Sequence, residues 1–137
     1  MNKDLTPEEI AHSCEEAAAL LEGRWVRGAW EQNGSYCVEG ALAAALGYSI
    51  EEVADGTQEG FGARRSLRSC QVYQAVTDTL VARLAKDPDM SEGNLDRVAM
   101  ELEDAGLPFW NDQDGRTEQD VLDLLHATAK RVQGVEE

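Results

Sequence analysis

Basic residues are scarce in this chain. Its 137 residues include 12 lysines and arginines against 27 aspartates and glutamates, which gives a net charge of −15 at pH 7. Binding to nucleic-acid phosphates or to anionic membranes needs lysine and arginine, so the composition argues against both kinds of partner. It favours another protein, one with a basic surface, although a high net charge often serves solubility alone.

Aromatic residues, long apolar runs, cysteines and histidines are also few. Aromatics make up 6% of the chain, so the core is expected to come from helix faces rather than from sheets. No run approaches the roughly 20 apolar residues that span a bilayer, and the N-terminus MNKDLTPEEI lacks a signal-peptide stretch, so we expect a cytoplasmic protein. Three cysteines without a C-x-x-C pair and two histidines indicate neither a disulfide framework nor a zinc ribbon. We expect no metal and no cofactor.

The pattern of apolar residues predicts an all-α fold, a compact bundle of five or six helices that forms one domain over residues 1–137. Thr6-Pro7-Glu8-Glu9 carries a capping box and a first-turn proline, and a buried stripe that includes Cys14 follows it up to Gly23. Residues 37–46 predict a short helix that is buried nearly all round.

Between these helices, residues 25–36 contain two tryptophans and the turn signal Asn33-Gly34. They are expected to form a loop, with a short β-hairpin as the alternative.

The second half of the chain starts with a short helix at Ser49 that stops near Gly56, followed by a polar stretch over residues 57–63. One long helix is predicted from Ser66 to Ala85, because apolar residues recur at helical spacing until shortly before Pro88.

Another amphipathic helix follows and ends at Gly106, and the apolar segment of residues 107–112 is expected to plug one end of the bundle. The last helix is predicted to begin at Thr117, with Asp120 three residues later in the capping position.

Two short motifs carry a family resemblance. Cys37-x-x-Gly40-Ala41-Leu42 follows a tryptophan-bearing loop, and Trp110-Asn111-Asp112 precedes Arg116-Thr117. In order and spacing they resemble an uncharacterised family of small proteins from actinobacteria and their phages, a domain of unknown function. The resemblance covers most of the chain. It implies such an origin and a contact between the Cys37 helix and the Trp110 loop, but no activity, and the long segment of residues 49–89 departs from the pattern.

Cys37 is the sharpest enzymatic candidate. It starts a helix, where the backbone dipole stabilises a thiolate, and His126 or His12 is the candidate base. This arrangement would make the protein a cysteine-dependent hydrolase or transferase. A small buried residue beside Gly40 explains Cys37 without chemistry, and we favour that interpretation because His126 lies in an apolar stretch of the last helix.

The segment from Trp110 to Gly115 places several oxygens at alternating positions, as part of a calcium loop does, but the terminal glutamate is missing. The favoured interpretation is a turn formed by Asn111 and Asp112, with Arg116 paired to Asp112 or Asp114. Trp110, Asn111, Asp112 and Arg116 are the candidate binding residues here.

Arg64, Arg65 and Arg68 form one basic cluster in an acidic chain and are a candidate site for an anion or an acidic partner. The alternative is that they only offset neighbouring glutamates. The three tryptophans and Phe61 could form an aromatic surface, although roles in the core or in loops are more frequent.

The leading functional hypothesis is a non-enzymatic acidic interaction protein, phage-encoded, that binds a basic host protein or mimics nucleic acid. The alternatives are the Cys37 enzyme and a homo-oligomeric module in which an apolar face of residues 66–85 pairs with its copy. Residues 1–60 carry a net charge of −9 and residues 61–137 a net charge of −6. The interaction surface is therefore expected on the first helix and on residues 31–59, with the arginine cluster at its border.

Overall fold

A computed structural model describes residues 5–27, 30–54 and 58–134, apart from the side chains of residues 52, 54 and 58–61. The helices are α1 (Pro7–Leu21), α2 (Val38–Ala45), α3 (Ile50–Ala54), α4 (Gln58–Ser69), α5 (Gln71–Ala85), α6 (Glu92–Ala105), α7 (Leu107–Asn111) and α8 (Glu118–Val132), and the strands are β1 (Glu31–Gln32) and β2 (Ser35–Tyr36). The prediction of a compact, mainly helical bundle is confirmed.

The first and last helices begin where the sequence predicts. Thr6 and Thr117 each accept a hydrogen bond from the backbone N–H three residues on, and Glu9 and Asp120 complete the two capping boxes. Helix α1 ends before Gly23, which has a φ of +75°. Cys14 lies on the buried stripe of α1, as predicted.

The hairpin alternative for residues 25–36 is also confirmed. Strands β1 and β2 pair antiparallel around Asn33 and Gly34, which both have positive φ as a tight two-residue turn requires. Trp25 adds an isolated bridge to Tyr36.

Two expectations in the second half are wrong in detail. Residues 58–63 belong to helix α4 rather than to a polar loop, and the single helix predicted from Ser66 is divided at Cys70, whose sulfur caps α5. Residues 107–111 form the short helix α7, because Pro108 lies in its first turn, where its missing N–H costs nothing.

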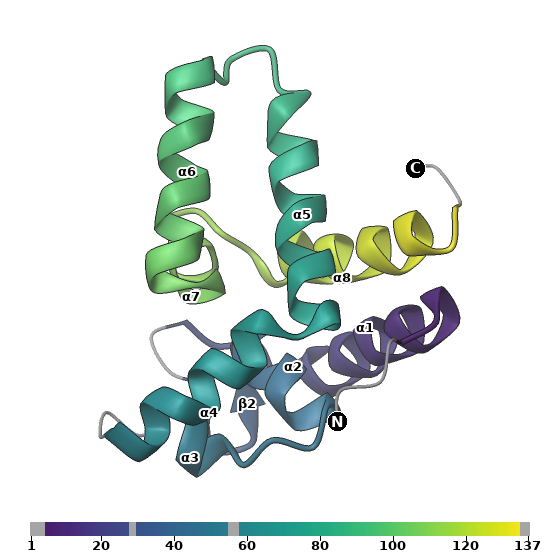
Figure 1. The fold of residues 1–137 in the computed structure, drawn as a ribbon, viewed down its shortest axis with the longest axis vertical. Helices are drawn as coiled ribbons and strands as arrows, with labels where there is room; N and C mark the ends of the chain where they lie inside the picture. The colour runs from purple at the N-terminus through teal and green to yellow at the C-terminus, as the bar shows by residue number, and fades with distance from the viewer. Residues whose placement is uncertain (1–4, 28–29, 55–57, 135–137) are drawn as a thin grey trace.

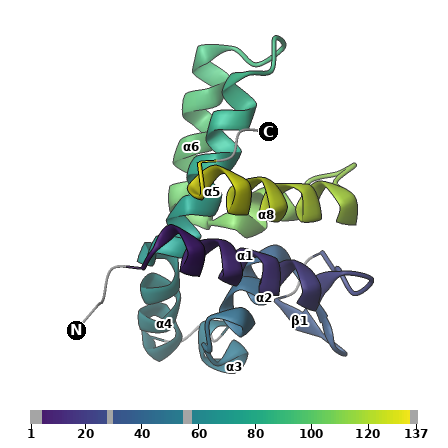
Figure 2. The ribbon, with the colours of Figure 1, turned by 90° about the vertical axis from the view of Figure 1, so that its right-hand side faces the viewer.

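The helices are arranged as a body with a projecting arm. Helix α1 lies along α8, with α2, α3 and α4 on the side of α1 away from α8, and the antiparallel pair α5 and α6 extends away from this body (Figures 1 and 2). Helix α6 packs against α5 and α7 and has one buried residue, Leu102. Helix α6 is therefore the mostly exposed half of the arm, whereas α5 contributes to the core.

The buried apolar side chains form one cluster to which α1, α2, α5 and α8 contribute most. On α5 the stripe of Val72, Val76 and Leu80 is fully or almost fully buried. The face that would pair residues 66–85 with a second copy is thus packed inside the fold. Within the described ranges, no helix combines the length and the apolarity needed to cross a membrane.

Candidate functional site

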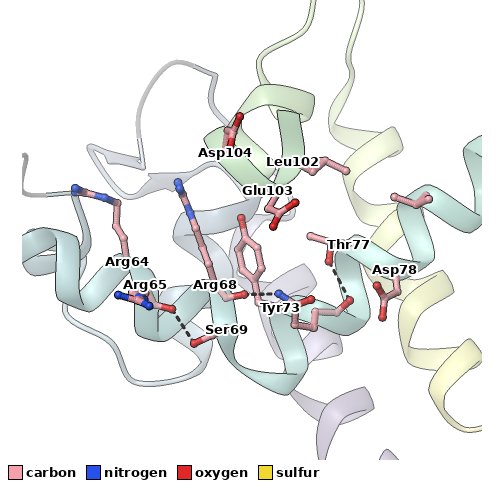
Figure 3. Close-up of a pocket in the computed structure, with 12 residues that line it drawn as sticks. Arg64, Arg65, Arg68, Ser69, Tyr73, Thr77, Asp78, Leu102, Glu103 and Asp104 are labelled. Carbon is pink, nitrogen blue, oxygen red and sulfur yellow. Dashed lines mark hydrogen bonds between the residues drawn. The ribbon is translucent and has the colours of Figure 1, made fainter. Parts of the chain in front are cut away.

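An open pocket of about 590 Å³ lies between α4, α5 and α6. Helix α4 contributes Arg64, Arg65 and Arg68 to its lining, and α6 contributes Glu103 and Asp104 from the opposite wall (Figure 3). Tyr73 of α5 lies between Arg68 and Glu103, and Leu102 adds apolar lining on α6 (Figure 3). The pocket therefore carries charges of both signs on separate helices, and it includes the whole basic cluster.

A buried carboxylate lies behind this pocket. Glu39 of α2 is fully buried, and its oxygens accept hydrogen bonds from the Tyr73 hydroxyl, from Arg68 Nε at 3.0 Å and from the backbone N–H of Leu107 at 3.2 Å. A buried carboxylate without such partners would cost several kcal/mol. The network instead joins α2, α4, α5 and α7 at one point.

Arg68 connects that network to the pocket. Its Nε–H is fixed by Glu39, its guanidinium carbon lies 5.9 Å from the centre of the Trp30 ring, and its side chain remains 25% exposed. A Cβ on Gly106 would lie 2.7 Å from both Arg68 Cζ and the Tyr73 hydroxyl. Glycine at 106 therefore allows the backbone to approach the pair closely, and its φ of +78° also favours glycine.

Burial is the main influence on the pKa values of Glu39 and Tyr73. Desolvation raises the pKa of Glu39, and hydrogen bonds and the positive charge of Arg68 offset part of this effect. Desolvation and the neighbouring Glu39 also raise the pKa of Tyr73 well above its ordinary range. Tyr73 therefore stays a hydrogen-bond donor, and the role of Glu39 that the contacts support is to orient Arg68 and Tyr73.

The other two arginines of the cluster differ from Arg68. Arg64 donates from Nη1 to the carbonyl of Val53 at 3.0 Å, so it binds one of the last carbonyls of α3. Arg65 is exposed on the pocket rim. Two of the three arginines thus have internal contacts, and Arg65 faces solvent.

Cys37 has a structural position. Its side chain is 2% exposed, and its sulfur accepts the backbone N–H of Gly40 at 3.3 Å as the cap of α2. Burial raises its pKa to about 12, so the thiol stays protonated at neutral pH. The effect of desolvation outweighs the helix-start hydrogen bonds that would stabilise a thiolate.

The candidate histidines are engaged elsewhere. His126 Nδ1 lies 2.8 Å from Glu15 Oε1, so this residue bridges α8 to α1. His12 is exposed and lies 3.8 Å from Glu16 on its own helix. The contacts of Cys37 and of both histidines therefore favour the interpretation without catalysis.

Thiol labelling tests this interpretation. We expect a neutral thiol reagent to modify Cys70, which is half-buried, and to leave Cys14 and Cys37 unmodified in the native protein. All three should react after denaturation. Mass spectrometry of the wild type and of a Cys70→Ser control reports the sites, and rapid native labelling of Cys37 would contradict the capping role.

Asn111 joins the two sequence motifs. Its Oδ1 accepts the Val38 backbone N–H at 3.0 Å and the Trp25 indole N–H at 2.8 Å, and its Nδ2 donates to the Val26 carbonyl at 3.2 Å. The predicted contact between the Cys37 helix and the Trp110 loop is thereby confirmed. Because Asn111 is fully buried, its role is to hold α2, α7 and the Trp25 loop together.

The expected pairing of Arg116 is wrong. Arg116 lies 3.8 Å from Asp120, donates to the Trp110 carbonyl and stacks on the Trp110 ring at 4.2 Å, whereas Asp114 lies 4.0 Å from Arg27. Asp120 is one turn ahead of Arg116 and is held by the α8 capping box, so it is the nearer carboxylate.

Of the remaining candidates, Trp110 and Arg116 line a second, smaller pocket of about 170 Å³ together with Arg83, Asp120 and Asp123. Asp112 accepts a side-chain hydrogen bond from Asn111 Nδ2 at 2.9 Å, and Asn111 ends helix α7. Trp110 is 5% exposed and Trp25 and Trp30 are half-buried, so the tryptophans do not form an exposed aromatic surface; the side chain of Phe61 lies outside the described residues. In the described part of the chain, no group of three or more His, Cys, Asp or Glu could hold a metal ion.

Glu39 and Tyr73 are not among the site residues predicted from the sequence. One signal was present: Glu39 lies inside the short helix of residues 37–46 that is buried nearly all round. A carboxylate in such a helix must find donors inside the fold.

The fold and the site define a small helical protein with an open pocket that carries charges of both signs and lies beside a buried glutamate. More particularly, the chain belongs to the family of unknown function DUF6197, whose sequence profile matches residues 5–131. No curated protein and no solved structure matches the chain.

Proposed function

We propose that this protein is a non-enzymatic interaction protein whose acidic surface binds a basic protein partner. We further propose that it originates from an actinobacterium or one of its phages and acts in the cytoplasm. The observation that carries the proposal is the exposure of the charge: in the described part of the chain, Glu39 is the one acidic residue that is buried, while the chain has a net charge of −15.

Helix α1 offers one acidic face. It contains four glutamates and no lysine or arginine, and all four glutamates are exposed while the opposite face of the helix packs into the core. Such a face attracts a basic protein and accelerates its association at low ionic strength.

The projecting arm offers a second acidic surface. Residues 86–104 include seven acidic and two basic residues, and they run from the tip of the arm along α6 to its base (Figure 2). Sequence reasoning places the interaction surface on the first half of the chain. The projection of α6 makes the arm an equally accessible candidate.

Affinity capture from a lysate of the source cells, at low and at moderate salt, tests the proposal. The wild type is expected to recover a specific protein with a basic surface, less of it at moderate salt because screening weakens exposed charge pairs. Mass spectrometry identifies the captured protein.

Two matched variants locate the surface. The first replaces Glu8, Glu16 and Glu22 with glutamine, and the second replaces Asp89 and Asp96 with asparagine and Glu92 with glutamine; each removes three exposed carboxylates. We expect one of them to reduce capture by roughly tenfold. Failure to capture a specific protein at either salt concentration, or full capture by the two variants combined, would contradict the proposal.

A further inference from the structure

We propose that the pocket between α4, α5 and α6 binds a small bipolar ligand, with its anionic group against Arg65 and Arg68 and its cationic group against Glu103 and Asp104. This inference is independent of the acidic-surface function. It rests on three features of the pocket: a pre-positioned arginine, an opposing acidic wall and a suitable size.

Arg68 is pre-positioned to bind an oxyanion. Glu39 holds its Nε–H, and Trp30, Gly106 and Tyr73 enclose the guanidinium, while the side chain still lines the pocket. Among the described residues no hydrogen bond is made by its two Nη groups. A guanidinium fixed at Nε presents its Nη donors in a rigid fork, which suits a carboxylate or another planar oxyanion. Arg65 adds a second positive charge on the same helix.

The opposite wall selects against a purely anionic ligand. Glu103 and Asp104 are exposed on α6 and line the same pocket, and Asp78 of α5 adds a third exposed carboxylate to the lining (Figure 3). They would repel a second negative charge and attract an ammonium or guanidinium group. A ligand that carries both charges gains favourable interactions with both walls, whereas a ligand with a single charge meets repulsion at one of them.

The size of the pocket fits a small molecule. A volume of about 590 Å³ lies within the usual range for small-ligand sites, and Val81 and Leu102 provide apolar lining between the charged residues. The ligand class is therefore an oxyanion and a cation joined by a short aliphatic chain.

Titration of ¹⁵N-labelled protein with a series of ω-amino acids, from 4-aminobutanoate to 8-aminooctanoate, tests the proposal by NMR. At least one member is expected to give saturable shifts of the Arg68 Nε–H signal and of the backbone amides of Glu103 and Asp104. Hexanoate and hexylammonium, which carry one charge each, are expected to bind at least about tenfold more weakly. Absence of saturable shifts across the series, or equal binding of the singly charged probes, would overturn the proposal.

Matched variants separate the two walls. Arg65→Ala and the Glu103→Gln/Asp104→Asn pair are each expected to lower the affinity for the best ω-amino acid by at least about threefold, because each removes part of the charge on one wall. Arg97→Ala and Asp96→Asn, which change exposed residues of α6 outside the pocket lining, should leave it unchanged. Arg68 is left intact because it contacts the buried network. Unchanged affinity in the pocket variants, or an equal loss in the α6 controls, would refute the assignment of the walls.

Discussion

Replacing Glu39 with alanine is expected to destabilise the protein by about 3–5 kcal/mol, the range found when one partner of a buried ion pair is removed. The substitution leaves the Arg68 guanidinium without its counter-charge and the Tyr73 hydroxyl without its carboxylate acceptor. It also removes an acceptor from the Leu107 N–H, which keeps the Tyr73 oxygen at 2.7 Å. Since typical domains are stable by about 5–15 kcal/mol, this loss would bring the protein close to unfolding.

Urea denaturation followed by circular dichroism measures this loss. Glu51→Ala, which removes an exposed carboxylate from α3, is the control and should change the free energy of unfolding by less than about 0.5 kcal/mol. A double-mutant cycle with Arg68→Ala isolates the pair: the double variant should lose less than the sum of the two single variants, because removing both charges leaves neither unpaired. Additive losses, or a loss below about 1 kcal/mol for Glu39→Ala, would show that the network does not hold the helices together.

The parts of the fold that the sequence predicts are those determined by neighbouring residues. The capping boxes at Thr6 and Thr117 involve side chains three residues apart, and the glycines that end α1 and α2 act on the adjacent turn. Such signals are complete within a few residues, so both helix starts and the Asn33-Gly34 turn could be predicted.

The incorrect predictions concern segments in which the local conformational preference and the tertiary packing favour different structures. Two glycines at positions 60 and 62 indicate a loop, yet residues 58–69 form a helix that packs against α3 and α5. The cost of about 1 kcal/mol for each glycine within a helix is offset by the burial of Leu67 and by the packing of α4 against α3 and α5. The break at Cys70 is equally hidden, because a thiol is not a usual capping group.

The candidate site depends on contacts that are distant in the sequence. Glu39 meets Arg68, Tyr73 and Leu107 at separations of 29, 34 and 68 residues. The arginine cluster is visible in the sequence, but the different roles of its members are not. Arg68 binds Glu39, Arg64 binds a carbonyl of α3, and Arg65 is exposed. The same applies to Asn111, which the sequence places in a turn and the fold uses as a bridge to α2.

Gly40 also depends on a contact outside its own helix, in this case a contact with backbone atoms of Trp30. A Cβ at this position would lie 1.9 Å from the Trp30 carbonyl oxygen and 2.8 Å from its carbon, far inside van der Waals contact. The atom in the way belongs to the backbone, so no side-chain rotation can relieve the overlap. That same carbonyl accepts the Cys37 N–H at 3.3 Å, which fixes the loop against the start of α2.

Gly40→Ala is therefore expected to destabilise the protein by about 3 kcal/mol, through strain in the Trp30 loop and the loss of that hydrogen bond. Gly93→Ala is the matched control. Gly93 also lies in a helix, but a Cβ there meets nothing within 4 Å, so alanine should be neutral or stabilise by up to about 1 kcal/mol. Urea denaturation of both variants gives the difference.

Native thiol labelling adds a local measurement to this comparison. If the loop moves away from α2, Cys37 should become reactive in Gly40→Ala while Cys14, on the buried face of α1, stays protected. Equal free energies of unfolding for the two alanine variants would mean that the Trp30 loop can move away from α2 without destabilising the protein. A loss of stability with Cys37 still protected would place the strain elsewhere. Labelling of Cys37 together with the loss would establish that the spacing of Cys37 and Gly40 is set by the approach of the Trp30 backbone to α2.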